Sequence, residues 1–170
     1  GAKDIEENRK PRVILTLEEQ QWLKEHPVVE LGIDPGFAPF ESFDEKGRYQ
    51  GIAADYVKLI EGMLGITMRV STRLSWTEVI EKVKKREIHI LPCVGINKER
   101  KQYLLFTDPY LSFPRVVFSR TSGVGPTSQE DLVRFAVGVQ ENSSHHGWIK
   151  ENSNLSPILY PTVQEAMLAL

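Results

Sequence analysis

The apolar positions in the first half of the chain alternate between two spacings. Short apolar runs bounded by turn residues, as expected of strands, occupy residues 28–33, 66–71 and 88–93. Residues 52–64 and 75–87 instead repeat apolar positions every three or four residues, which is typical of helices that pack on a sheet. The apolar face predicted for the first helix consists of Ile52, Tyr56, Ile60 and Met63.

Polar residues and breakers mark where the helices begin and end. Three predicted helix starts have a Ser or Thr followed three residues later by Glu, the spacing at which each side chain caps the other residue's backbone amide. The pairs are Thr16–Glu19, Ser75–Glu78 and Thr162–Glu165. Pro27 is predicted to stop the helix that follows Thr16, and Gly65 is placed to end the helix of residues 52–64.

The second half of the chain continues the alternation. Strands are predicted over residues 115–120, over residues 135–140 and within residues 156–161. Helices are predicted over residues 128–134 and 143–152, and from residue 162 onward. Alternating strands and helices favour an α/β fold with mostly parallel sheets. Ligands of such sheets bind outside the carboxyl ends of the strands, so we expect a site among residues 34–40, 94–100 and 140–145.

Composition and charge exclude several classes of protein. The 170 residues are 41% hydrophobic and 26% charged, which is ordinary for one globular domain or two small lobes. The net charge of -2 and the scattered basic residues indicate neither a nucleic-acid surface nor a polybasic membrane patch. The densest basic run, residues 82–87, is interpreted as the solvated end of a helix. The single cysteine, Cys93, excludes an intrachain disulfide and a multi-cysteine zinc site.

The two ends of the chain carry expectations of their own. The polar residues 1–14 are interpreted as a linker or a remnant of expression. No apolar run approaches the ~18 residues that a membrane helix requires, and no signal-peptide core is present. The helical pattern at the C-terminus stops at Leu170 without a helix-ending residue, so we expect a longer natural sequence.

Arg100 is a candidate for binding a carboxylate. It follows the third predicted strand in the segment GINKER, where Asn97 is placed to cap a short helix. A guanidinium fork beside free backbone amides suits a carboxylate. The alternative is a surface arginine in a charged turn.

The other post-strand segments hold further candidates. Phe37 and Phe40 are interpreted as pocket walls or as core residues beneath a loop. Asp34 and Glu41 suit a ligand ammonium group, or Asp34 only begins a turn before Pro35.

The start of the predicted helix at residues 143–152 is a third candidate. Ser143 and Ser144 donate to an anion or merely cap that helix. The adjacent His145 and His146 are a weak metal signal, because neighbouring residues on a helix face different ways. No cofactor-binding or catalytic motif is present, so no cofactor, no metal and no catalytic residue is predicted.

Taken in order, these segments resemble a known family. GIDPGFAPFESFDEKGRYQGIAADYV resembles the opening of bacterial extracellular solute-binding proteins of family 3, the periplasmic amino-acid-binding type. SWTEVIEKVKKREIHILPCVGINKERKQYLLFTDPY and FAVGVQENSSHHGWIKEN resemble the stretches that follow. The lead-in LTLEEQQWLKEHP is similar to that of Venus-flytrap sensor domains in membrane-bound histidine kinases and diguanylate cyclases. The resemblance covers roughly Leu15 to Leu170.

The resemblance implies a fold and a set of site residues. The fold is the hinged periplasmic binding protein type 2, with lobe 1 at residues 15–113 and an incomplete lobe 2 at residues 114–170. Arg100 matches the arginine that clamps a ligand carboxylate, with Cys93 and Gly95 beside it. The remaining matched positions are Asp34 as a pocket polar group, Phe37 as an aromatic wall, Trp76 near the cleft, and Ser143 and Ser144 as carboxylate donors from lobe 2.

The sequence also departs from the family pattern. Cys93 stands where a serine or similar donor is common, and Asn142 where glycine is common. The acidic residue that holds a ligand ammonium in this family would fall beyond Leu170. An unfinished lobe 2 exposes apolar surface, which favours association or swapping between chains, such as a homodimer.

The leading interpretation is a non-enzymatic periplasmic sensor domain. A small carboxylate solute, such as an amino acid, binds in the interlobe cleft, and hinge closure signals to a covalently attached kinase or cyclase domain of an inner-membrane protein. The alternative is a solute-binding protein of an amino-acid transporter. A third interpretation is an enzyme on the same scaffold, which requires a pocket carboxyl group with a raised pKa, such as Glu41 or Asp34.

Overall fold

The computed structural model describes residues 13–121 and 123–170. Most of the predicted linker at residues 1–14 therefore lies outside the described residues. The described residues form two compact units, one of residues 13–74 and 81–93 and the other of residues 75–80, 94–121 and 123–170. These units do not follow the lobes expected at residues 15–113 and 114–170, and that lobe boundary stays a prediction.

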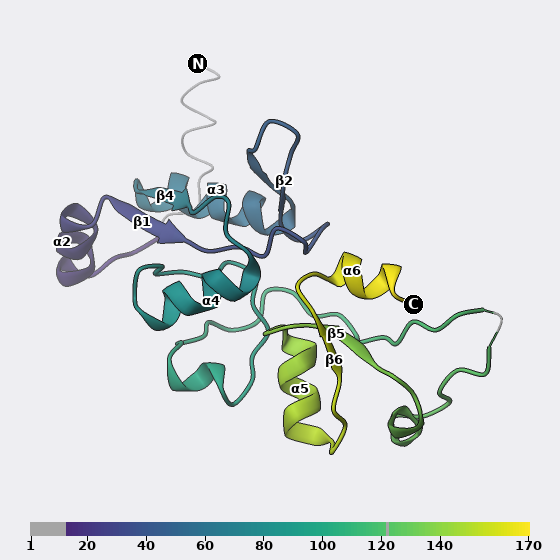
Figure 1. Cartoon of the computed structure of the whole chain (residues 1–170). Helices are drawn as coiled ribbons and strands as arrows, with labels where there is room; N and C mark the ends of the chain where they lie inside the picture. Colours follow the sequence, from purple (N-terminus) through teal and green to yellow (C-terminus); the bar gives the residue numbers. More distant parts are fainter. Residues whose placement is uncertain (1–12, 122) are drawn as a thin grey trace. The chain divides into compact units, whose positions relative to one another are not determined.

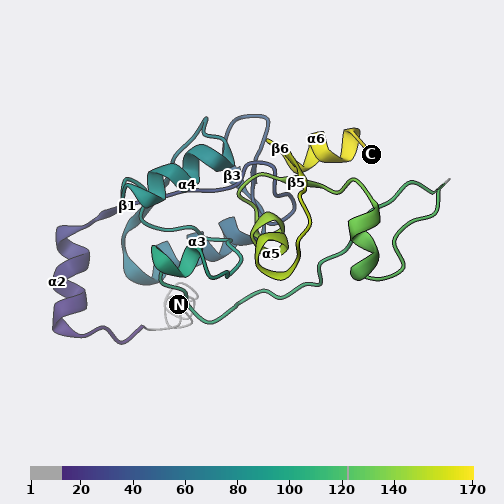
Figure 2. The same ribbon diagram turned by 60° about the horizontal axis from the view of Figure 1, so that its bottom comes forward.

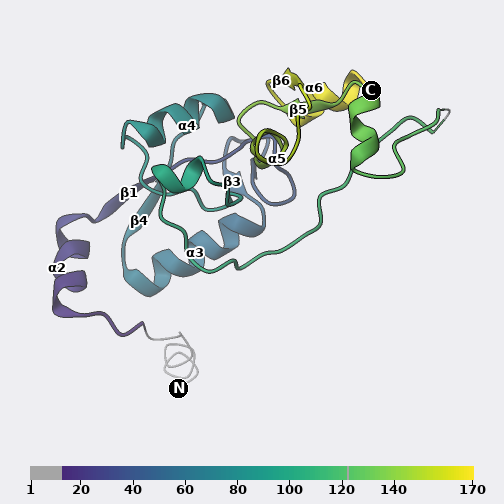
Figure 3. The same ribbon diagram turned by 90° about the horizontal axis from the view of Figure 1, so that it is seen from below.

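Unit 1 is built on a parallel strand pair joined by a helix. Strands β1 (Val28–Leu31) and β4 (Thr67–Val70) pair in parallel, with Val29 opposite Met68. Helix α3 (Ile52–Leu64) makes the crossover and runs beside β4 (Figure 1, Figure 3). The predicted α/β architecture with parallel sheets is confirmed here.

Helix ends in unit 1 follow the predicted signals. Helix α2 (Leu17–Glu25) begins with the capping box of Thr16 and Glu19. Gly65 ends α3 in the left-handed conformation, with φ of 69°. Ser75 and Glu78 exchange hydrogen bonds at the start of α4 (Trp76–Lys84), whose first residues belong to unit 2 and the rest to unit 1.

The apolar face predicted for α3 is wrong. Ala53 and Val57 are the buried residues of this helix, whereas Ile52 and Tyr56 are 38% and 41% exposed. The start of the helix determines this orientation. Gly51 has φ of 117°, and an added Cβ there would lie 2.5 Å from the carbonyl oxygen of Phe40. The backbone of the preceding loop therefore lies against the helix start, where only small side chains fit.

A hairpin that the sequence indicated only as a turn follows the loop after β1. Strands β2 (Ser42–Phe43) and β3 (Tyr49–Gln50) pair in antiparallel fashion. The carboxylate of Asp44 accepts hydrogen bonds from the backbone amides of Lys46 and Arg48, which closes the turn. The hairpin anchors the far end of the segment that carries Asp34 and Phe37.

Unit 2 repeats the parallel arrangement on a smaller scale. Strands β5 (Gly138–Gln140) and β6 (Ile158–Tyr160) pair in parallel, as predicted. Helix α5 (Ser144–Asn152) connects them and packs beside β5 (Figure 2). Helix α6 (Val163–Leu168) follows, and Thr162 caps it as predicted.

Several predicted elements of the chain are shorter or absent. The run 115–120 forms no strand, and its residues Val116, Val117 and Phe118 are 62%, 59% and 63% exposed. The run 88–93 makes only one bridge, between Ile90 and Leu31. The helix predicted at residues 128–134 is the 3-10 helix η2 (Glu130–Arg134). None of the helices in residues 13–121 and 123–170 is both long and apolar enough to cross a bilayer.

Candidate functional site

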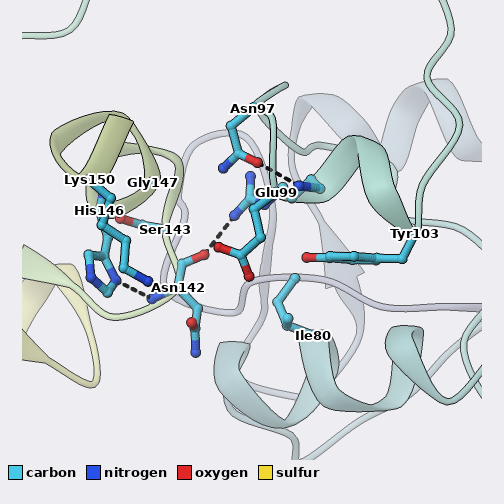
Figure 4. Close-up of a pocket in the computed structure, with 10 residues that line it drawn as sticks. Ile80, Asn97, Glu99, Tyr103, Asn142, Ser143, His146, Gly147 and Lys150 are labelled. Atoms are coloured by element: carbon cyan, nitrogen blue, oxygen red, sulfur yellow. Dashed lines mark hydrogen bonds between the residues drawn. The ribbon is translucent and has the colours of Figure 1, made fainter. Parts of the chain in front are cut away.

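Arg100 lies in unit 2 at the start of the 3-10 helix η1 (Arg100–Gln102) and is 3% exposed. Its backbone N–H donates to Oδ1 of Asn97 at 2.8 Å, so Asn97 closes this turn as expected. The guanidinium donates through Nη1 to the carbonyl of Gly95 at 2.8 Å, and through Nη2 to the carbonyl of Asn142 at 2.6 Å. Figure 4 shows Asn97 and Asn142 with the dashed bonds that each makes to this arginine. The alternative of a surface arginine is therefore wrong.

Asn142, whose carbonyl binds Arg100, lies in the turn of residues 140–143. It adopts φ of 57°, a left-handed conformation that asparagine tolerates better than most residues. Its carbonyl also accepts from Nε1 of Trp76 at 2.9 Å. Its N–H donates to Nδ1 of His146 at 3.2 Å (Figure 4). Its side-chain Nδ2 donates to Oγ1 of Thr77 at 3.2 Å. Both the main chain and the side chain of Asn142 therefore hold this turn in place.

Trp76 contacts Arg100 as well as the turn. Its side chain is buried at 5% exposure, and the guanidinium carbon of Arg100 lies 5.5 Å from the ring centroid. This distance is within the range of a cation–π interaction. Trp76 thus orients the arginine from one side while its indole N–H binds the same carbonyl that the arginine binds.

The start of α5 lies next to Gly95. The hydroxyl of Ser143 accepts from the N–H of His146 at 3.1 Å, which caps the helix. An added Cβ on Gly95 would lie 2.7 Å from Cβ of Ser144 and 3.9 Å from Nη1 of Arg100. The helix start and the arginine therefore share a space that only glycine leaves open at position 95.

A small polar pocket surrounds these groups. Its walls include Asn97, Glu99, Tyr103, Ser143, His146 and Lys150, besides Arg100 and Asn142. The free volume is about 10 Å³, which is about what one water molecule requires. Burial lowers the pKa of His146, and Lys150 lowers it further, while Glu141 and Glu99 oppose the shift. Unprotonated His146 is the form that accepts the Asn142 N–H.

Asp34 and Glu41 form a buried acidic pair within unit 1. The backbone N–H of Asp34 donates to Oε1 of Glu41 at 2.8 Å, and Oδ1 of Asp34 accepts from the N–H of Gly36 at 3.0 Å. Glu41 is 1% exposed, and burial raises its pKa from the ordinary 4.5 to about 8, with the charge of Asp34 contributing. The hydrogen bonds from Asp34 and from the Tyr49 hydroxyl act in the opposite direction. Glu41 is therefore mostly neutral at pH 7.

The sequence-predicted site residues divide between the two units. Unit 2 holds Trp76, Gly95, Arg100, Ser143 and Ser144. Unit 1 holds Asp34, Phe37 and Cys93, with the rings of Phe37 and Phe40 packed at 4.9 Å between centroids. The roles of all eight residues as ligand contacts stay predictions. In the described part of the chain, no three His, Cys, Asp or Glu side chains gather as metal ligands do.

Sequence reasoning missed three residues of this site. Asn142 appeared only as a departure from glycine, Thr77 did not appear, and His146 appeared only as a weak metal signal. The one available signal was that position 142 has asparagine where glycine is common in the family. Glycine is favoured in the left-handed conformation, and an asparagine at such a position adds a side chain that can form a hydrogen bond.

Two relatives of known sequence are similar to this chain. The virulence sensor protein BvgS of Bordetella pertussis is 28% identical over 126 residues, which is 74% of this chain and 10% of that protein. The histidine-binding periplasmic protein of Escherichia coli K12 is 28% identical over 131 residues, covering 73% of this chain and 48% of that protein. The chain thus spans about a tenth of the first relative and about half of the second.

Solved structures share the fold. The crystal structure of the B. pertussis BvgS periplasmic domain superposes with a TM-score of 0.78 at 25% identity, covering 91% of this chain and 30% of that chain. The ancestral amino-acid-binding protein AncCDT-1, a precursor of cyclohexadienyl dehydratase, gives a TM-score of 0.72 at 23% identity, covering 88% and 67%. The predicted Venus-flytrap fold is confirmed by these likenesses.

The family assignment rests on most of the chain. The family model of bacterial extracellular solute-binding proteins, family 3, matches residues 29–166. This range includes the Arg100 pocket and all of the two parallel strand pairs except Val28. The chain therefore belongs to the bacterial extracellular solute-binding proteins, family 3.

Proposed function

We propose that this chain is a periplasmic sensor domain that binds a small carboxylate solute at Arg100. The observation that carries the proposal is a guanidinium group that is almost fully buried beside the start of α5 and next to the Trp76 ring. A carboxylate suits this arrangement because it accepts two parallel bonds from a guanidinium fork and is favoured at a helix N-terminus. Gly95, Ser143 and Ser144 are proposed to donate to the same group.

The sensor role is supported by the similarity to BvgS, a virulence sensor protein. Ligand binding is proposed to close the two predicted lobes, and an attached kinase or cyclase domain of an inner-membrane protein reads that change. The similarity to a histidine-binding protein supports an amino acid as ligand. Asp34, Phe37 and Cys93 are proposed to contact the rest of the solute.

The test is a binding screen on the wild-type chain and on Arg100→Ala. Amino acids and small organic acids are added, and the melting temperature is measured, because a ligand of the native state raises it by mass action. For each hit, we expect Arg100→Ala to raise the Kd by about 30-fold or more, since removing a buried charged partner costs ~2 kcal/mol or more.

The matched control is Arg134→Ala. Arg134 also belongs to unit 2, and its side chain is 78% exposed. This variant is expected to bind like the wild type. Equal affinity in Arg100→Ala and the wild type, measured by calorimetry, contradicts the proposed role of Arg100.

A second candidate function is delivery of a solute to a transporter, which the histidine-binding relative favours. The two functions share the binding site and differ in what is attached to it. The full natural sequence distinguishes them, since a sensor would include a membrane helix and a signalling domain, whereas a transport protein would end after its second lobe.

An enzyme on this scaffold is the third candidate, favoured by the likeness to a dehydratase precursor. Glu41 has the raised pKa of a general acid. We propose a structural role for it, because its carboxyl group is 1% exposed and bound by the Asp34 N–H within the same loop. If NMR shows that any bound solute is chemically converted, the proposal of a structural role for Glu41 is overturned.

A further inference from the structure

The Arg100 pocket as it stands has little room for a solute. Its free volume of about 10 Å³ fits one water molecule rather than an amino acid. The guanidinium fork is also engaged, through Nη1 with Gly95 and through Nη2 with Asn142. A carboxylate that binds this fork must therefore displace a protein group.

Of the two carbonyls that Arg100 binds, that of Asn142 is the one that can move away, because Asn142 is far from Arg100 in the sequence. Gly95 is only five residues from Arg100, so its bond closes a local turn. The bond from Asn142 joins positions 42 residues apart in the chain. This bond therefore depends on how the turn of residues 140–143, here called the Asn142 turn, is held.

Three side chains hold the Asn142 turn. Trp76 donates to the carbonyl of Asn142 at 2.9 Å, beside the bond from Arg100. Thr77 accepts from the Asn142 side chain at 3.2 Å, and His146 accepts from its backbone N–H at 3.2 Å. Glycine at position 142 would keep the left-handed backbone and lose the bond to Thr77.

We propose that the Asn142 turn is an internal occupant of the arginine site, whose carbonyl covers Arg100 until a carboxylate ligand replaces it. The side-chain bond from Asn142 to Thr77 sets how firmly the turn stays in place. This inference concerns the regulation of the same site and rests on the proposed function. Its main test, however, measures the exposure of Arg100 without any ligand.

The test compares wild type with Thr77→Val and Asn142→Gly, which remove the same hydrogen bond from opposite ends. Each protein is treated with phenylglyoxal, which adds across two guanidinium nitrogens, and modified arginines are mapped by mass spectrometry. One net hydrogen bond changes an equilibrium by roughly 2- to 10-fold. We therefore expect Arg100 to react about 2- to 10-fold faster in both variants.

A second readout is the indole N–H of Trp76. The chain has three tryptophans, so its indole NMR signal is assigned with Trp22→Phe and Trp148→Phe. Hydrogen exchange at this N–H should accelerate in both variants. Thr67→Val is the matched control, because Thr67 is an exposed residue of β4, and it should change neither readout. Arg134 serves as the internal reference for arginine reactivity.

The outcomes separate this inference from the proposed function. Unchanged reactivity of Arg100 in both folded variants overturns the inference, whatever ligands bind. Faster reaction together with tighter binding of a carboxylate hit supports it. If Arg100 reacts faster but the affinity of that hit does not change, the proposed competition between the Asn142 carbonyl and the ligand carboxylate is overturned. If no carboxylate from the screen binds any variant although Arg100 reacts faster, the proposed function fails and the covering of Arg100 by the turn is supported.

Discussion

Glu41 is one side chain whose ionisation makes the stability of a loop depend on pH. It lies at the end of the loop that follows β1 and binds the backbone of Asp34 at the loop's start. The carboxyl group is nearly inaccessible, and burial raises its pKa to about 8. Asp34 and Tyr49 are the other titratable groups that face it. Ionisation of Glu41 thus costs free energy only in the folded state.

This cost predicts how stability depends on pH. A raised folded-state pKa gives a contribution that is complete below 4.5 and is lost as the pH rises to about 8. Glu41→Gln cannot ionise, so its free energy of unfolding should fall less across this range than that of the wild type. Each unit of pKa difference corresponds to about 1.4 kcal/mol, so the difference should reach a few kcal/mol.

Urea unfolding at pH 5 and pH 8 measures this difference. Glu45→Gln, at an exposed position of the neighbouring turn, is the control and should follow the wild type. If Glu41→Gln and the wild type show the same pH dependence, the Glu41 carboxyl group is ionised in the native protein at neutral pH.

At the scale of elements, helix α5 packs closely against the segment that carries Arg100. Gly147 lies in this helix, and an added Cβ would overlap Nδ2 of Asn97. Asn97 uses its Oδ1 to hold the N–H of Arg100 at 2.8 Å. A larger residue at position 147 must therefore push away the side chain that positions the arginine.

We expect Gly147→Ala to destabilise the protein by ~1–3 kcal/mol, as overpacking does, although alanine favours helices. Gly62→Ala is the matched control, because Gly62 lies within α3 with no atom near the new Cβ, and it should stabilise by about 0.5–1 kcal/mol. In an Asn97→Ala background, the loss from Gly147→Ala should largely disappear. A loss of the same size in that background contradicts the contact as its cause. Chemical unfolding of the wild type and the four variants measures each effect.

The capping box at Thr16, the side-chain cap at Thr162 and the end of α3 at Gly65 were predictable because they depend on neighbours in sequence. The buried face of α3 was not, because it depends on the backbone of Phe40 at the helix start. In the same way, the sequence left a surface position open for Arg100, and the role of Asn142 was not predictable because its partners lie 42 to 66 residues away in the chain.

At the scale of the whole molecule, the run 115–120 is the most exposed strand-like sequence. Val116, Val117 and Phe118 are consecutive, apolar and more than half exposed, and the run pairs with no strand of the described chain. Extended apolar segments of this kind are templates for pairing between chains. The homodimer expected from the sequence stays a prediction, and this run is where we expect contact.

Self-association of this chain should therefore depend on Val117. Val117→Lys is expected to reduce the rise in average mass with concentration, measured by sedimentation velocity, because an edge lysine opposes pairing. Val124→Lys is the control, since Val124 is 89% exposed but lies outside the run. A wild type that stays monomeric at all concentrations contradicts this prediction.

Both parallel strand pairs described above are joined by a single helix, α3 in one unit and α5 in the other. Parallel strands cannot pair until the chain between them has crossed back to the end of the sheet where the first strand began. Loop-closure entropy therefore delays the formation of each pair. Each crossover lies within its own unit. The order in which the chain acquires structure is therefore governed by two local closures, and each can proceed before the distant contact between Arg100 and Asn142 forms.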